Sequence, residues 1–396
     1  MIVLLMTSLR FAARALALSL ALTAAGALCV VGPASPAPAA PGNRISPAAV
    51  GSPVGGQQLA GRGVIVNLKR GVPPPPAMPG ASFVLADMDT GQILVARAPH
   101  APHLPASTLK TLTALTLIPL LDVNMRIVVK PQDIGVDGTR LGIVPGTTYA
   151  AGTLLQGMLM ASGNDTAYAL ARGNRSVAVT LAEMNATAAH LGALDTVAKD
   201  PSGLDKPGQQ TSAYDLALIG RAAMALPSFR SYVNTRQVTL SGGRSADGKR
   251  RPGFQISNHN KLLFNYPGAI GIKNGYTNAA KFTYIGAATK GGKTYLITEM
   301  SSPQGSWRPT AALLDWAFAH GSSLTPIGEL VAPNEGAEAK PAVPPKVGPQ
   351  IQALPATTRE SAGQPSFPSW IGVLGATSAL ALIAAWAWRG APRKRH

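Results

Sequence analysis

Short apolar segments on either side of Asp89-Thr90-Gly91 predict the first two β-strands of the chain. They span residues 82–86 and 92–96, and the glycine between them can supply the positive φ of a tight hairpin turn. The later strand patterns are residues 269–273, 282–289 and 294–301. We therefore expect one hairpin near residue 90 and a second group of strands after residue 268.

The segment between these two groups of strands is predicted to be helical. Apolar residues recur at helical spacing from Thr108 to about Leu226, and a closing helix is expected at residues 307–319. Strands from both ends of this region can share one antiparallel sheet only if the helical middle packs beside it. The pattern predicts an α+β domain over residues 81–320, with a cleft between the sheet and the helical lobe.

Residues 1–39 have the layout of a secretory signal peptide. Two arginines precede an apolar stretch at about residues 15–31, and small residues and prolines follow up to Ala39. An uncleaved anchor is the alternative. Cys29, the single cysteine, lies in this stretch behind Leu28 rather than behind a small residue, which argues against a lipidated cysteine. No disulfide is therefore possible in the domain.

Residues 370–388 form an uncharged stretch long enough to cross a bilayer as a helix. At about 1.5 Å per residue this segment spans roughly 28 Å. Tryptophans mark its ends, and the basic tail at residues 389–396 follows at once. The positive-inside bias puts this tail in the cytoplasm and the domain on the outer side of the cell membrane.

Two proline-rich segments separate the predicted domain from these ends. Residues 40–80 are rich in proline and glycine, and residues 321–369 form a proline-rich tether. Proline fixes φ and removes a backbone donor, so both segments are expected to be extended and unpacked.

The chain has a formal net charge of +17, but its basic residues are dispersed. Because the chain is predicted to be exported, this surplus favours anionic wall polymers or lipid head groups over nucleic acid. The histidines are also scattered in the sequence, so neither a metal nor another cofactor is expected.

Ser107 and Lys110 are the first candidate catalytic pair. Ser107 begins an apolar helix, where free backbone N–H groups favour developing negative charge. Lys110 lies three residues on, on the same face, and could act as a base if desolvation or a second cation such as Lys273 lowered its pKa. Taken alone, such a pair is more often a capping serine with an exposed lysine.

Ser162 and Asn164 form the second candidate cluster. They follow an apolar helical pattern at residues 154–160, so a short polar loop is expected there. The hydroxyl could relay a proton, and the amide could orient Lys110 and hold a substrate carbonyl. In isolation this tripeptide is equally typical of an ordinary helix cap.

The third cluster lies on a predicted strand at residues 270–277. Lys273 and Thr277 share a face and could meet an anionic carboxylate, while Gly275 allows a second backbone to come close. The N–H of Tyr276 could pair with that of Ser107 as an oxyanion hole.

In this order the three clusters resemble the S-x-x-K, S-x-N and K-T-G motifs of the penicillin-recognising serine enzymes. Flanking strings resemble low-molecular-mass D-alanyl-D-alanine carboxypeptidases. These strings are Leu104-Pro-Ala-Ser-Thr-Leu-Lys110, Leu159-Met-Ala-Ser-Gly-Asn-Asp165, Met184-Asn185-Ala186, Ser202-Gly-Leu-Asp205 and Ser257-Asn-His-Asn-Lys-Leu262. The resemblance implies a β-lactamase/transpeptidase-like fold, with a five-stranded antiparallel sheet flanked by helices and an all-helical lobe.

The resemblance also implies a reaction. Ser107 would attack the carbonyl between the two D-alanines of a peptidoglycan stem pentapeptide, and Lys110 would take its proton. Ser162 and Asn164 would relay the proton and position the peptide, and water would then hydrolyse the acyl-enzyme. β-Lactam antibiotics would acylate the same serine.

The resemblance further implies that the third cluster, on the predicted strand, binds substrate. Lys273, Asn274 and Thr277 would bind the terminal carboxylate, with Gly275 and Tyr276 beside them. Asn274 stands where the usual motif has threonine. An amide still donates a hydrogen bond, so activity is expected to survive, with altered recognition of the substrate's C-terminus.

Two alternatives share the three clusters. A class A-like β-lactamase needs an efficient deacylating carboxylate, yet no Glu-x-x-x-Asn string lies between the second and third clusters. A catalytically silent β-lactam sensor needs a cytoplasmic signalling partner, and residues 389–396 are too few to form one. The tether and predicted anchor suit a wall enzyme better than either.

Overall fold

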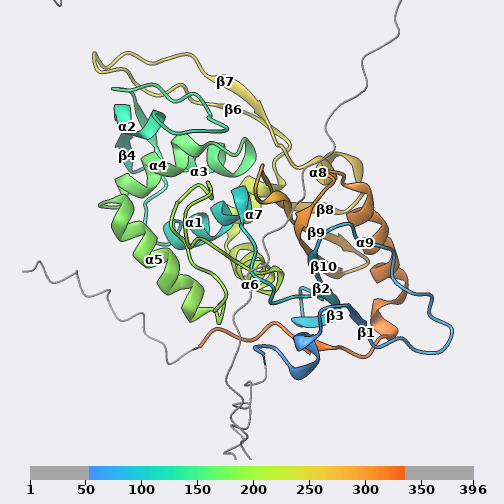
Figure 1. The fold of residues 1–396 in the computed structure, drawn as a ribbon. Coiled ribbons are helices and arrows are strands. Elements are labelled where there is room, and N and C mark those ends of the chain that lie inside the picture. The colour runs from blue at the N-terminus through green and yellow to red at the C-terminus, as the bar shows by residue number, and fades with distance from the viewer. Residues whose placement is uncertain (1–52, 335–396) are drawn as a thin grey trace, which may run out of the picture.

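An antiparallel sheet with a helical lobe on one face forms the framework of the structure (Figure 1). The computed structural model describes residues 53–334. The strands of the main sheet are β1 (Val64–Val66), β2 (Ser82–Asp87), β3 (Gln92–Arg97), β8 (Ala269–Thr277), β9 (Lys281–Lys290), β10 (Lys293–Ser302) and β11 (Gly328–Glu329). Their order is β1-β3-β2-β10-β9-β8, with β11 also paired to β3. The five longest form the predicted five-stranded sheet, and β1 and β11 extend it.

The hairpin near residue 90 is confirmed. β2 and β3 are antiparallel, with Phe83 opposite Arg97. The Asp87 carboxylate accepts the backbone N–H groups of Asp89 and Thr90 at 3.0 Å each, and Gly91 has φ 84°. The side chain of Asp87 therefore closes the turn, and glycine supplies the left-handed backbone.

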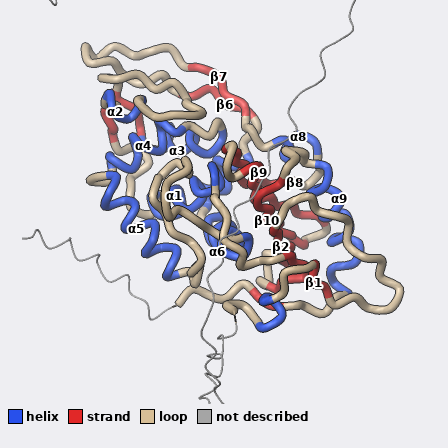
Figure 2. Tube along the Cα trace, in the orientation of Figure 1, coloured by secondary structure: helices blue, strands red, loops and turns tan. Residues whose placement is uncertain are grey.

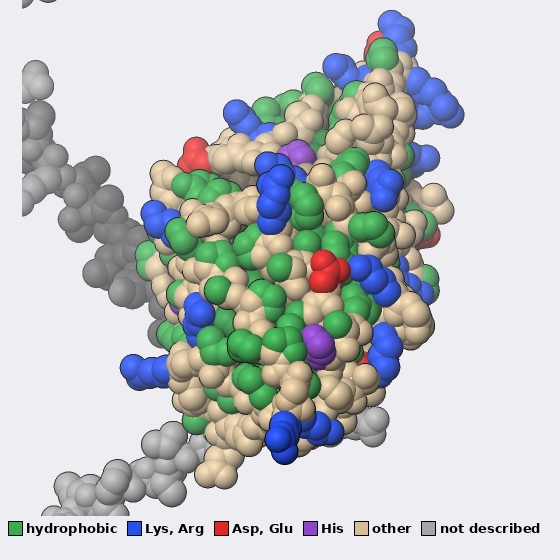
Figure 3. All heavy atoms as spheres, turned by 90° about the vertical axis from the view of Figure 1, so that its right-hand side faces the viewer, with side chains coloured by type: hydrophobic (Ala, Val, Ile, Leu, Met, Phe, Trp, Pro, Cys, Tyr) green, Lys and Arg blue, Asp and Glu red, His purple; other side chains and the backbone are tan. Residues whose placement is uncertain are grey.

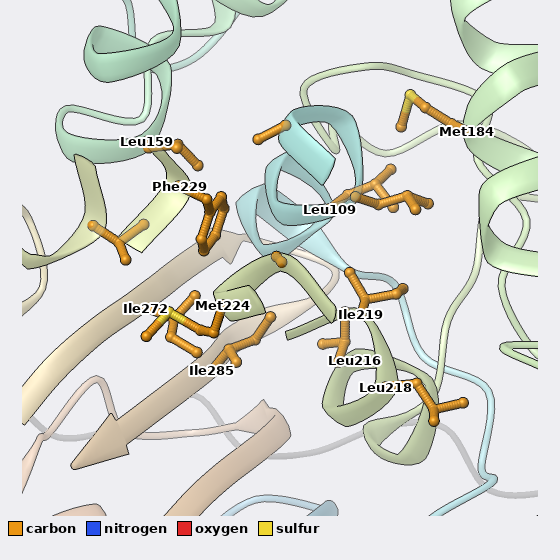
Figure 4. Packing of buried hydrophobic residues seen from close by; sticks show 14 of the residues in the cluster. Leu109, Leu159, Met184, Leu216, Leu218, Ile219, Met224, Phe229, Ile272 and Ile285 are labelled. Carbon is orange, nitrogen blue, oxygen red and sulfur yellow. The ribbon is translucent and has the colours of Figure 1, made fainter. Parts of the chain in front are cut away.

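The helices of the lobe pack against the sheet through α6. The helices between the two groups of strands are α1 (Lys110–Leu117), α2 (Pro131–Ile134), α3 (Ala151–Met160), α4 (Asn164–Gly173), α5 (Val177–His190), α6 (Ala213–Ala225) and α7 (Pro227–Asn234). Leu216 and Ile219 of α6 gather with Ile272 of β8 and Ile285 of β9 in this core (Figure 4). Each of these side chains is at most 1% exposed, and burying one contributes about 1.5–3 kcal/mol.

The other face of the sheet is covered by α8 (Lys261–Asn265) and α9 (Arg308–His320). Leu313 and Leu314 of α9 pack there with Leu85 and Ile297. With both faces covered, the strands are buried along most of their length, so they read in the sequence as short apolar runs.

The lobe also contains short strands that the sequence pattern does not reveal. β4 (Arg126–Val128) pairs with β5 (Thr148–Ala150), and β6 (Gln237–Leu240) pairs with β7 (Phe254–Ser257). Both pairs lie apart from the main sheet (Figure 2). Strands of three or four residues are too short for an alternating pattern to stand out.

The folded unit is longer than residues 81–320. The turn η1 (Gln57–Ala60) and β1 precede that range and β11 follows it, and both of these strands pair with β3. The outer edge of β3 offers unpaired backbone groups, which these segments satisfy.

The predicted signal peptide, bilayer-spanning segment and basic tail lie outside the described residues. Within residues 53–334, no helix combines the length and apolar character needed to cross a membrane.

Candidate active site

Ser107 lies in a 3-10 turn, η2 (Ala106–Leu109), that leads directly into α1. Two glycines let other backbone segments approach this turn. A Cβ on Gly203 would lie 1.9 Å from the Ala106 carbonyl oxygen, and one on Gly275 would lie 2.6 Å from the Ser107 nitrogen. Only glycine permits such close approach. A loop and strand β8 therefore hold Ser107 in place, while its side chain stays partly exposed.

The amine of Lys110 is fully buried among three oxygen atoms. Its Nζ lies 2.6 Å from Asn164 Oδ1, 2.6 Å from the Ser202 carbonyl oxygen and 2.9 Å from Ser107 Oγ. The amide and carbonyl oxygens can only accept, so they take the two N–H groups of a neutral amine. The remaining lone pair then faces the Ser107 hydroxyl, as a general base requires.

The electrostatic surroundings favour that neutral amine. Burial, and next the charge of Lys273, hold the pKa of Lys110 well below its ordinary value, while Asp200 and Asp165 act in the opposite direction. Desolvation disfavours a charged amine, and a neighbouring cation adds to the effect.

The second cluster follows α3, as the sequence predicts, and its Asn164 is already the first residue of α4. Ser162 has a left-handed backbone with φ 60°, which turns the chain so that Asn164 starts α4. The Asn164 amide nitrogen donates to the Asp137 carbonyl at 2.6 Å. Its amide oxygen is thereby left facing Lys110.

Lys273 is the second buried lysine. It lies on β8, an edge strand of the sheet, is 1% exposed and donates to the Asn274 carbonyl oxygen at 2.7 Å. Burial lowers the pKa of Lys273 to about 7. The pKa of His259 is lowered too, by burial and then by Lys273, so this imidazole lies in the field of the same amine.

The predicted substrate-binding residues beyond Asn274 continue along β8. Gly275 faces the Ser107 backbone, and Tyr276 is half exposed. The Thr277 hydroxyl donates to Asp205 Oδ1 at 2.9 Å. A substrate carboxylate that bound Thr277 would therefore replace an exposed carboxylate of the protein.

Asn274 lies on the opposite face of β8 from Lys273. It pairs with Tyr284 of β9, whereas Lys273 pairs with Ile285, and side chains alternate along a strand. Asn274 lines a hollow of about 150 Å³ together with His259 and Tyr284. The residue that departs from the usual motif thus borders a hollow beside the strand that carries Lys273.

Three residues with supporting contacts were given no role from the sequence, although Asp165 and Ser202 lie in the strings that carry the resemblance. Ser202 supplies a carbonyl to Lys110, and Asp200 accepts the backbone N–H and the hydroxyl of Ser202 at 2.7 and 2.6 Å. Asp165 accepts the backbone N–H groups of residues 141–143. Two features of the sequence could have pointed to the acids. Asp165 directly follows Asn164 at the start of a helix, and Asp200 lies in a turn sequence.

Three of the five predicted catalytic residues are in direct contact, since Lys110 touches both Ser107 and Asn164. Ser162 is two residues before Asn164, and Lys273 acts on Lys110 through its charge. Such a site can activate a serine hydroxyl for attack on a carbonyl. Within residues 53–334, no cluster of His, Cys, Asp and Glu is suited to hold a metal ion.

Comparison with known proteins agrees with this chemistry. Residues 70–301 match the family described as D-alanyl-D-alanine carboxypeptidase. The chain belongs to this family. It is 42% identical over 253 residues to the D-alanyl-D-alanine carboxypeptidase DacB2 of Mycobacterium tuberculosis, covering 62% of this chain and 84% of the relative. It is 30% identical over 246 residues to the D-alanyl-D-alanine carboxypeptidase DacF of Bacillus subtilis, covering 60% and 62% of the two chains.

Solved structures of carboxypeptidases and transpeptidases share the fold. A D-alanyl-D-alanine carboxypeptidase from Mycobacterium tuberculosis superposes with a TM-score of 0.61 at 40% identity, over 67% of this chain and 99% of the other. A Streptomyces DD-transpeptidase superposes with a TM-score of 0.60 at 26% identity, over 62% and 100%. The α+β fold predicted from the sequence is confirmed.

Proposed function

We propose that this serine D-alanyl-D-alanine carboxypeptidase uses Ser107 as its nucleophile and Lys110 as its base when it removes the terminal D-alanine from peptidoglycan stem pentapeptides. The observation that carries the proposal is the contact of the buried Lys110 amine with one hydroxyl and two acceptor-only oxygens. Because burial favours the neutral amine, its two N–H groups can bond the two acceptor oxygens and its lone pair can face the hydroxyl.

The acylation step follows from these contacts. Lys110 takes the Ser107 proton while Oγ bonds to the carbonyl carbon between the two D-alanines. The backbone N–H of Ser107, with that of Tyr276, would hold the developing oxyanion. The C–N bond then breaks, and the leaving amine receives a proton through Ser162. Deacylation repeats the sequence with water as the nucleophile and Lys110 again as the base.

The terminal carboxylate is assigned to the β8 side of the site. Lys273 and Thr277 share one face of that strand, and Lys273 supplies positive charge when protonated. Asn274 borders the adjoining hollow, which makes it a candidate for tuning which C-terminal residue is accepted.

β-Lactams are expected to acylate Ser107 as well, because they present a strained amide to the same nucleophile. A slowly hydrolysed adduct would then block the enzyme.

The cellular location is also a proposal. Residues 1–39 support export, and residues 370–388 followed by a basic tail support a single membrane anchor with the domain on the wall side. Protease treatment of intact cells tests this location, because an outside domain is digested while a cytoplasmic control protein survives.

The deciding experiment measures D-alanine release from a stem pentapeptide by the full chain, with mass spectrometry of the protein after incubation with penicillin. We expect D-alanine release and a single adduct on the Ser107 peptide, and Ser107→Ala should lose both. Rapid penicillin turnover without D-alanine release would indicate a β-lactamase instead. A stable adduct without peptide cleavage would indicate a sensor.

A further inference from the structure

A second hollow, lined by arginines, lies between the β4–β5 pair and the arm formed by residues 241–253, which joins β6 to β7. Its volume is about 370 Å³. The four cations that line it are Arg126, Arg244, Arg250 and Arg251. We call it the arginine hollow. None of the proposed catalytic residues lines it, so it is a site apart from Ser107.

The backbone around the arginine hollow is held by hydrogen bonds between its segments. Thr148 donates to the Arg244 carbonyl at 2.7 Å, and Arg244 donates back to Thr148 at 2.9 Å. Arg251 donates to the Gly243 carbonyl at 2.9 Å. The base of the arm thus continues the β4–β5 pair as a further paired segment, and these contacts fix where the arginines emerge.

The positive charge in the hollow is not neutralised by the residues around it. No carboxylate is among the lining residues. Asp247, the one acid of the arm, is engaged with Lys249 at 3.1 Å. Within the described part of the chain, the side chains of Arg126, Arg250 and Arg251 have no hydrogen-bonded or ion-paired acceptor, and Arg244 makes one bond, to the Gly248 carbonyl.

A concave site lined by guanidinium groups suits a phosphate. Guanidinium presents a planar fork of donors that matches phosphate oxygens and, unlike lysine, it stays charged at all accessible pH values. Several guanidinium groups converging on one hollow can contact one phosphate or two successive ones.

We propose that the arginine hollow binds the phosphodiester groups of an anionic polymer in the cell wall. The polymer is favoured over a membrane surface because the arm carries no large apolar side chain, which interfacial membrane sites combine with their cations. The arm also lies at the opposite end of the molecule from the first and last described residues (Figure 1), and Lys and Arg side chains gather on this projection (Figure 3).

The experiment measures binding of the full chain to soluble poly(glycerol phosphate), and in a parallel arm to vesicles of phosphatidylglycerol and of phosphatidylcholine. The test variant combines Arg244→Gln, Arg250→Gln and Arg251→Gln. We expect it to lose at least tenfold in affinity for the polymer and to keep its D-alanine release from a soluble pentapeptide. Binding of the unaltered chain to the polymer should weaken as salt is raised, because dissolved ions screen the attraction between exposed charges.

The matched control combines Arg62→Gln, Lys69→Gln and Arg70→Gln, which removes the same charge from an exposed segment elsewhere. It should change polymer affinity by less than threefold. An equal loss in both triple variants would overturn the proposal in favour of diffuse attraction, and binding to phosphatidylglycerol vesicles but not to the polymer would overturn it in favour of the membrane. Failure of polymer binding with intact D-alanine release would reject this site and leave the proposed catalytic function standing.

Discussion

Asn164 turns its amide oxygen toward Lys110, at 2.6 Å from Nζ, because its amide nitrogen is held by the Asp137 carbonyl. The oxygen accepts a hydrogen bond but carries no full charge, so it orients the amine without holding a proton on it. A carboxylate of nearly the same shape, introduced by substitution with aspartate, would place a full negative charge at the same position. Comparing the two side chains therefore tests what that charge does to the amine.

Replacing this amide by a carboxylate should shift the pH profile. In Asn164→Asp the new charge would stabilise protonated Lys110 and raise its pKa, because an opposite charge in direct contact favours the charged form. The acidic limb of kcat/KM for D-alanine release should move to higher pH, with about 10–100-fold less activity at pH 7 and recovery toward pH 9. Asn164→Ala, which adds no charge, should lose activity without the upward shift. The same profile in both variants would contradict the assigned role of the amide.

Acylation of Ser107 should require the amine of Lys110, and another cation should not be able to replace it. Lys110→Arg keeps the charge but cannot accept a proton from Ser107, and Lys110→Met removes both functions. Each should slow acylation by penicillin by about 10²–10⁴-fold, the usual contribution of a general base. Acylation is followed by mass spectrometry at short times. Near-normal labelling of the arginine variant would exclude Lys110 as the base.

Lys273 should reduce stability at neutral pH. Burial lowers its pKa in the folded chain to about 7, whereas in the unfolded chain it is near the ordinary value of about 10.4. Between these two values the unfolded chain binds a proton that the folded chain does not, so stability rises with pH across that window. At and below pH 7 nearly the full cost of charging the buried amine is present.

Lys273→Met should therefore raise the free energy of unfolding at pH 7 by about 2–4 kcal/mol, and the gain should fade as the pH approaches 10.5. Urea unfolding at pH 7 and at pH 10 measures this difference. The same variant should lose D-alanine release. A destabilised variant at pH 7 would show that the buried amine contributes more through its hydrogen bond than it costs in desolvation.

The glycine between Lys273 and the oxyanion region should be intolerant of any side chain. A Cβ at Gly275 would lie 2.6 Å from the Ser107 nitrogen and 2.5 Å from Thr283 Oγ1, so η2 would have to move. Gly275→Ala should lose at least about 100-fold in kcat/KM, because displacement of a reacting group by about 1 Å has costs of this order. Circular dichroism should show a folded protein. Gly63→Ala, where an added Cβ meets nothing within 4 Å, is the control and should be unaffected.

The sequence predicted those elements whose pattern is long or chemically distinctive. The hairpin around Asp89 and the strand that carries Lys273 lie where the pattern placed them, because turn glycines and apolar runs mark both. β4 and β6 were not predicted, because strands of three or four residues are too short to show an alternation of apolar and polar residues. The pairing of β1 with β3 joins segments that are far apart in the sequence, so no short stretch of residues reveals it. The proline-rich surroundings of β1 also argued against a strand there.

The candidate site could be proposed from the sequence as a set of residues, but its contacts could not be predicted. Motif spacing identifies Ser107, Lys110 and Asn164, whereas the Ser202 carbonyl that completes the surroundings of Lys110 is a backbone atom with no residue signature. The partner of Asn274 across the sheet, Tyr284, also depends on the register between β8 and β9, which only the folded sheet defines.

The pairing at β3 limits how the main sheet can grow. β1 lies against Val95 to Arg97 and β11 against Gln92 and Ile93, so the outer edge of β3 is closed along nearly its whole length. Within the described part of the chain, β8 is the strand at the other end of the sheet, with β9 as its one neighbour. At the end of the sheet beyond β3, the edge left is only that of β1, with three residues, and β11, with two, whereas β8 offers nine residues to an extended peptide that joins the sheet by backbone hydrogen bonds. The long edge belongs to the strand of Lys273, and the short strands at the other end of the sheet offer little backbone for sheet-to-sheet aggregation.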